Sequence, residues 1–243
     1  MSEALTVADS KRAFHSAFPY VISPLYRRMV DELLVELHLL SRQRGFQPDA
    51  LFATGLVQVF DGFSQGYRPE GQREALFTAL CSSSGFDGAV LRGQHQQAVA
   101  AMGHHRMEEV RQWIEHQGEG APAPVAEALA GIRREDFHYS RLMAVGLLTL
   151  LERAGGSDGV EPGVLREAAH NLGVAMGLLR DRLDKDLSLY AANLEKMAQA
   201  VELMEETLAA DRRRRERQAD RSEKERQIAA EVKGSDQGVP SAG

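Results

Sequence analysis

A run of apolar residues at alternating spacings of four and three constrains the fold of this chain most. A repeat of 3.5 residues keeps one face of a helix against a neighbouring helix, so the run predicts a helix packed along another helix. It covers 26 residues, which is about 39 Å of helix at 1.5 Å per residue. Its members, called the seam below, are Leu183, Leu187, Tyr190, Leu194, Met197, Val201, Met204 and Leu208.

The helical pattern continues past the seam, but the apolar stripe does not. From Asp211 the chain reads DRRRRERQADRSEKERQIAAEV, with neither Gly nor Pro, and residues 211–232 are called the arm below. Residues 211–226 carry 8 basic and 5 acidic side chains, a net charge of +3. Opposite charges four residues apart, such as Arg212 with Glu216, favour an exposed helix. The candidate interaction residues of the arm are Arg212, Arg213, Arg214, Arg215, Arg217 and Arg221.

The arm and the seam each leave alternatives open. The mixture of charges favours a solvated arm over one that contacts anionic lipid or a protein. Nucleic acid is disfavoured because acidic residues are interleaved with the arginines. Ala191, Ala198 and Ala200 flank the seam and widen its apolar stripe, which favours packing within one molecule over pairing between two copies. We therefore expect a monomer.

Composition favours an all-α protein. Good helix formers dominate the 243 residues, aromatic residues make up only 6%, and β-branched residues are not clustered. The net charge of -6 and the single Cys81 suit a protein of a reducing compartment without an internal disulfide. The N-terminal sequence has no signal-peptide core, and the longest apolar run, residues 142–151, is too short to span a membrane.

Caps and breakers divide the chain into helices. Asp9 is the expected N-cap of the first helix, and Ser23 followed by Pro24 is expected to open the second. Asp87 and Gly103 bound another helix, and a single long helix is predicted over residues 127–153. Further along, GGSDGVEP is predicted as a loop and Pro162 as a helix start. The expected organisation is a flexible N-terminus (1–8), a compact helical domain (9–180), a seam helix with the arm (181–232) and a disordered tail (233–243).

The best enzyme alternative is a di-iron-like metal site. Glu135 with His138, and Glu167 with His170, form two E-x-x-H pairs, and such pairs hold metal in ferritin-like bundles. About one such pair is expected by chance from 22 Glu and 8 His, and neither lies midway along a long, clean amphipathic helix. The sequence GFSQG, residues 62–66, matches a nucleophile elbow but lacks the required preceding strand. No catalytic, metal or cofactor site is therefore predicted.

Four long stretches, in the same order along the chain, resemble the thylakoid formation protein family, also called the photosystem II biogenesis protein family. The resemblance spans about residues 5–210. The stretches are TVADSKRAFHSAFPYVISPLYRRMVDELLVELHLLS, GLVQVFDGFSQGYRPE, FHYSRLMAVGLLTLLE and DKDLSLYAANLEKMAQAVELMEE.

The resemblance, rather than the periodicity, supplies an expected function. It implies an all-helical, non-enzymatic auxiliary factor for thylakoid membrane biogenesis and photosystem II assembly and repair. Members associate with membrane FtsH protease complexes and favour their accumulation. The implied location is the cytoplasmic side of the thylakoid membrane, as a soluble or peripheral protein. Photosystem II itself and anionic thylakoid lipid are further expected partners, and no cofactor is implied.

Overall fold

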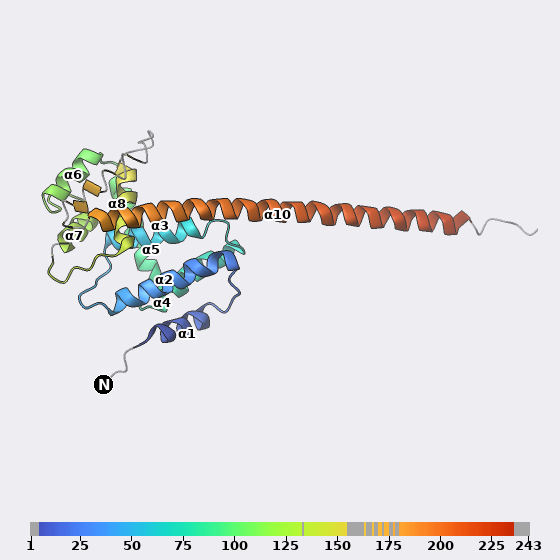
Figure 1. The fold of residues 1–243 in the computed structure, drawn as a ribbon, viewed down its shortest axis with the longest axis horizontal. Helices are drawn as coiled ribbons and strands as arrows, with labels where there is room; N and C mark the ends of the chain where they lie inside the picture. The colour runs from blue at the N-terminus through green and yellow to red at the C-terminus, as the bar shows by residue number, and fades with distance from the viewer. Residues whose placement is uncertain are drawn as a thin grey trace, which may run out of the picture. The chain divides into compact units, whose positions relative to one another are not determined.

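A computed structural model shows an all-α fold that ends in one long helix (Figure 1). It describes residues 5–132, 134–154 and 180–235, together with 163, 167, 170, 171, 173, 174 and 177. These residues include no strand, as predicted. The chain divides into two compact units, Met1–Met197 and Ala198–Gly243.

The N-terminal helices begin at capping residues. Helix α1 (Val7–Ala17) starts after Thr6, whose side chain accepts a hydrogen bond from the backbone N–H of Asp9. The Asp9 carboxylate accepts one in return from the backbone N–H of Thr6, at 2.7 Å, which completes a capping box. The prediction of Asp9 as the N-cap was therefore wrong by three residues. Helix α2 (Pro24–Arg42) begins as predicted, with Ser23 at the N-cap and Pro24 in the first turn.

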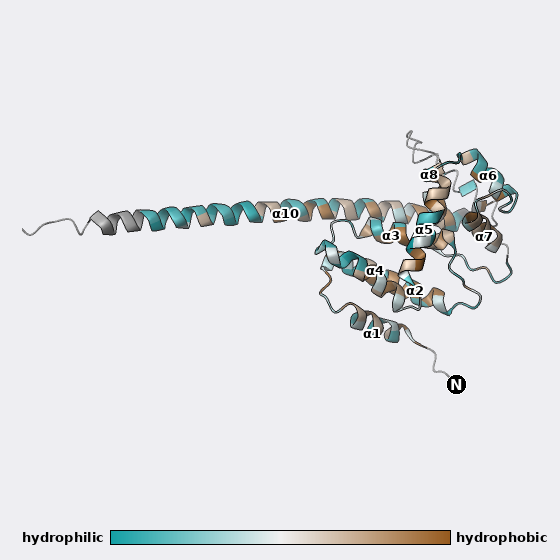
Figure 2. Ribbon diagram, turned by 180° about the vertical axis from the view of Figure 1, so that it is seen from behind, coloured by the Kyte–Doolittle hydropathy of each residue, from teal (hydrophilic) through white to brown (hydrophobic). Residues whose placement is uncertain are grey.

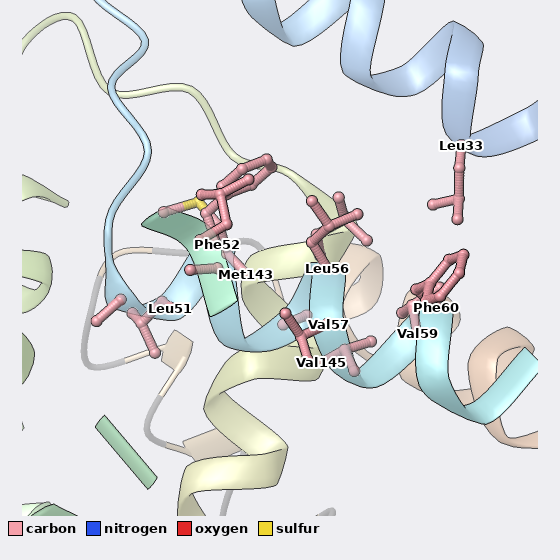
Figure 3. Close-up of a cluster of buried hydrophobic side chains, with 14 of the residues drawn as sticks. Leu33, Leu51, Phe52, Leu56, Val57, Val59, Phe60, Met143 and Val145 are labelled. Carbon is pink, nitrogen blue, oxygen red and sulfur yellow. The ribbon is translucent and has the colours of Figure 1, made fainter. Parts of the chain in front are cut away.

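The core is built around the crossing of α3 (Ala50–Phe63) and α8 (Arg141–Ala154), which are the most extensively packed pair. Glycines on both helices let the two backbones meet. A Cβ on Gly55 would overlap the carbonyl oxygen of Leu142, and one on Gly146 would overlap that of Leu51. Figure 3 shows Leu51, Phe52, Leu56, Val57, Val59 and Phe60 of α3 gathered with Met143 and Val145 of α8 and with Leu33 of α2.

Shorter helices surround this crossing. A 3-10 turn (Glu70–Gln72) leads into α4 (Arg73–Ser82). Helix α5 (Gly88–Met102) lies between the predicted Asp87 cap and Gly103. Helices α6 (Met107–Glu115) and α7 (Ala123–Gly131) follow.

The predicted single helix over residues 127–153 is wrong, because it is two helices. Helix α7 ends at Gly131, and α8 begins at Arg141. Ser140 starts the second helix. Its hydroxyl accepts a hydrogen bond from the N–H of Leu142 at 3.1 Å, and its carbonyl accepts one from the N–H of Met143 at 3.0 Å. These bonds satisfy N–H groups that have no partner inside the helix, so a helix can begin there.

The long C-terminal helix is α10 (Arg180–Ser235). Figure 2 shows its residues changing from a mixture of apolar and polar to almost wholly hydrophilic along its length. The GGSDGVEP loop and the helix start at Pro162 lie outside the described residues, as do residues 236–243 of the predicted tail. Among the described helices, none combines the length and apolar character that a membrane crossing requires.

Candidate functional site

The first part of α10 is anchored to the helical unit through the seam. Leu183 and Leu187 are almost completely buried. Tyr190 and Met197 are half-buried and pack against the core cluster, and Leu194 is half-buried as well.

Two glycines and an aromatic pair receive these seam residues. A Cβ on Gly173 would collide with the side chain of Leu183, and one on Gly62 would lie 2.9 Å from Leu194 Cδ1. The Tyr190 ring meets Phe63 edge-on at 6.0 Å between centroids. Burial, and to a smaller extent the negative charge of Glu152, raises the pKa of Tyr190 to about 12. These contacts fix the part of α10 that ends at Met197.

Polar side chains also hold the start of α10. The Tyr139 hydroxyl donates a hydrogen bond to Asp186 at 2.8 Å, and the Arg182 guanidinium lies over the Tyr139 ring at 4.7 Å. Burial and the bond to Asp186 raise the pKa of Tyr139. Between Arg182 and Asp186, Asp184 Oδ1 lies 3.1 Å from His170 Nε2. The sequence analysis did not identify these pairs, since their members are 14 to 47 residues apart and carry no local signal.

The rest of the seam belongs to the second unit, which begins at Ala198. Val201 and Met204 are half-buried there, whereas Leu208, the last seam residue, is 43% exposed. The apolar stripe therefore loses cover along the helix before the arm begins.

All six candidate arginines of the arm are exposed. Arg221 pairs with Glu225 at 3.0 Å, as the i,i+4 spacing predicted. Arg212 instead donates to the carbonyl of Leu208 at 3.4 Å. The six side chains thus face solvent, although Arg221 and Arg212 already have partners within the helix.

The candidate enzyme residues are not brought together into a ligand set. Glu135 and His138 lie in the connection between α7 and α8. They therefore do not lie on one helix face, where an E-x-x-H pair within a helix would place them. Glu167 is exposed, and His170 is engaged with Asp184. Ser64 of the GFSQG sequence is buried at the C-terminus of α3, where its hydroxyl accepts a hydrogen bond from Arg73 at 2.7 Å. Over the described residues, no group of three or more potential metal ligands occurs.

The chain's sequence matches the thylakoid formation protein family model over residues 6–219. The chain belongs to the thylakoid formation protein family. Its match takes in the whole seam and the arm as far as Ala219. Membership implies a role in thylakoid and photosystem II biogenesis, and the expectation drawn from the sequence is confirmed at that level.

Individual relatives agree with this assignment. The chain is 56% identical over 217 residues to Protein Thf1 of Prochlorococcus marinus (strain MIT 9313), covering 89% of both chains. It is 50% identical over 217 residues to Protein Thf1 of Parasynechococcus marenigrum (strain WH8102), covering 89% of this chain and 95% of the relative. A solved structure of Psb29 superposes with a TM-score of 0.75 at 34% identity, covering 87% of this chain and 98% of Psb29.

Proposed function

We propose that this chain is a non-enzymatic adaptor in photosystem II assembly and repair, associating with membrane FtsH protease complexes and stabilising them. In this proposal it acts at the cytoplasmic face of the thylakoid as a peripheral protein. Helix α10 is held by the helical unit at its start, and the arm makes the contact. Family membership supports the pathway, and the exposed, charged end of α10 supports the choice of the arm as the surface.

The observation that carries the proposal is the contrast between the two parts of α10. Leu183 and Leu187 are buried, whereas residues 211–227 are exposed at every position. A helix that is polar all round gains nothing from packing, so only local pairs support it. The arm therefore contributes little to the stability of the fold. This favours a role for the arm in contact with another surface.

The charge of the arm indicates what kind of surface it meets. Residues 211–226 carry a net charge of +3 with no apolar side chain larger than alanine. Such a segment cannot insert into hydrocarbon, but it is attracted to anionic headgroups or to an acidic protein surface. The attraction is screened by salt.

A pull-down from thylakoid extract tests the partner and the surface together. The full chain and a chain ending at Ala210 are each immobilised, and captured FtsH subunits are quantified at low ionic strength. We expect the full chain to retain FtsH and the shortened chain to retain clearly less. Equal capture by both would move the binding surface to the helical unit. Failure of the full chain to capture FtsH would refute the proposed partner.

A further inference from the structure

One face of α10 has a charge pattern that is its own complement. The face consists of Gln199, Glu202, Glu206, Ala209, Ala210, Arg213, Arg217 and Asp220. At 100° per residue these positions fall within a sector of about 100°. All are exposed except Ala209, which is half-buried. The centre of this sector lies about 140° around the helix from the seam, so the seam leaves it uncovered.

The pattern is a mirror about the midpoint of Ala209 and Ala210. Position by position, the mirror relates Glu206 to Arg213 and Glu202 to Arg217. The same relation matches Glu205 with Arg214 at the edge of the face, and farther out Glu195 with Lys224 and Lys196 with Glu223. Each of the five charged residues between positions 195 and 208 thus has an opposite charge at its mirror position.

Within a single helix, this arrangement places like charges next to each other, although Arg213 and Arg217 also lie three residues before Glu216 and Asp220. Glu202 and Glu206 lie four residues apart on one face, as do Arg213 and Arg217, and like charges at this spacing repel. An antiparallel second helix would place glutamates opposite arginines and relieve both repulsions. Alanines at the centre of the face allow the two helix axes to approach closely.

We propose that this face binds a second copy of the chain in antiparallel orientation, with a two-fold axis between Ala209 and Ala210. Glu202 and Glu206 of each copy then meet Arg217 and Arg213 of the other, so the interface is isologous. Such a pair departs from the monomer expected from the seam, because it uses the opposite face of the helix. This inference does not depend on the proposed FtsH association.

The second copy would also run along the anchored part of α10. In that part Ser188 and Ala192 of the same sector are exposed, whereas Ala191 is half-buried and Asp184 lies 3.1 Å from His170. The seam side is the side that packs on the helical unit. The pairing is therefore centred on residues 199–220, where every position of the face except Ala209 is exposed.

Exposed ion pairs each contribute little, so the self-association is weak and salt-dependent. Sedimentation equilibrium of the purified full chain at about 0.1–1 mM suits a weak complex. We expect dimers at low salt, with the dissociation constant rising at least about tenfold between roughly 50 and 500 mM NaCl. A chain that stays monomeric at about 1 mM and low salt would overturn the proposal.

Charge-reversal variants test the face itself. E202R/E206R and R213E/R217E should each be monomeric where the wild-type chain is dimeric, because like charges then face each other. A 1:1 mixture of the two should associate, since every reversed residue meets an opposite charge on the other chain. Two chains that had merely lost their helix could not restore each other in this way. A mixture that stays monomeric, or single variants that associate like the wild type, would refute this face.

Matched controls separate the face from net charge. D211R/E216R makes the same charge change as E202R/E206R, but its mirror positions are the uncharged Leu208 and Leu203. R212E/R215E matches R213E/R217E in the same way, with mirror positions Thr207 and Met204. Both controls should dimerise within about threefold of the wild type. Controls that fall apart as completely as the face variants would show that net charge alone governs association, and would contradict the proposal.

Discussion

Asp49 has two opposed interactions at the start of α3. Its carboxylate accepts a hydrogen bond from the backbone N–H of Phe52 at 2.8 Å and so caps the helix. Burial nevertheless outweighs the capping bonds, and together with the charge of Glu127 it raises the pKa of Asp49 to about 6. The ionised form is therefore less favourable in the folded chain than in the unfolded chain.

Replacing Asp49 with Asn should stabilise the protein at neutral pH. Because the pKa of Asp49 is higher in the folded chain than in the unfolded chain, its protonated carboxyl group favours folding. This contribution to the free energy of unfolding is complete below about pH 4 and is lost as the pH rises through about 6. Asn caps a helix about as well as Asp and does not ionise. We expect D49N to raise the free energy of unfolding by roughly 1–3 kcal/mol at pH 7 and by almost nothing at pH 4.

Denaturant titrations at several pH values measure this difference. D87N, at the exposed N-cap of α5, controls for the Asp-to-Asn exchange itself. A gain for D49N that is the same at pH 4 and pH 7 would contradict the assignment to Asp49 ionisation.

Gly146 is required by the contact between α3 and α8. Because a Cβ there would overlap the Leu51 carbonyl, G146A must push the two helices apart and should cost on the order of 3 kcal/mol. The matched control is G93A in α5, where a Cβ meets nothing within 4 Å and Ala should stabilise the helix by about 0.5–1 kcal/mol. Thermal unfolding of both variants tests the contrast, and equal effects would show that the crossing tolerates separation.

At the level of single residues, some features could be predicted from sequence and others could not. Ser23 and Asp87 were recognisable because a cap is a local pattern. Thr6 was missed because Asp9, three residues later, carries an equally strong cap signal. The need for Gly146 is a property of two helices meeting, and neither helix alone reveals it.

Among the helices, α10 combines buried and exposed leucines within a few residues, so substitutions there should differ in their effect on stability. L187A should destabilise the helical unit by about 2–4 kcal/mol, since Leu187 is almost fully buried. L189A, two residues farther along the same helix, removes a side chain that is 50% exposed and should cost less than about 1 kcal/mol. Chemical denaturation of both variants measures the difference. A cost for L187A as small as that for L189A would show that the seam does not anchor the helix.

Element boundaries were predictable where the sequence offered one strong signal. Helices α2 and α5 follow from Ser23–Pro24 and from Asp87 with Gly103. The prediction of one helix over residues 127–153 was wrong because the whole interval is rich in helix-forming residues. The start of the second helix at Ser140 is recognised only from its hydrogen bonds. The seam and the arm were visible as a periodicity and its loss. The pairs Tyr139–Asp186 and His170–Asp184 were not visible, because they join distant parts of the chain.

For the whole molecule, the two units have different sources of stability. Residues 1–197 contain the buried core, whereas the described side chains from 211 onward are all exposed. A chain ending at Ala210 should therefore keep a thermal midpoint within about 2 °C of the full chain. Differential scanning calorimetry checks this, and a large drop would mean that the arm supports the core.

Binding to isolated thylakoid membranes at two ionic strengths tests the adaptor role of the arm most directly. The full chain and the chain ending at Ala210 are co-sedimented with membranes at roughly 50 and 500 mM NaCl. We predict that the full chain binds more than the shortened chain at low salt, and that the difference narrows at high salt as the arginines are screened. Equal binding of the two chains at low salt would contradict the role assigned to the arm and leave the helical unit as the binding surface.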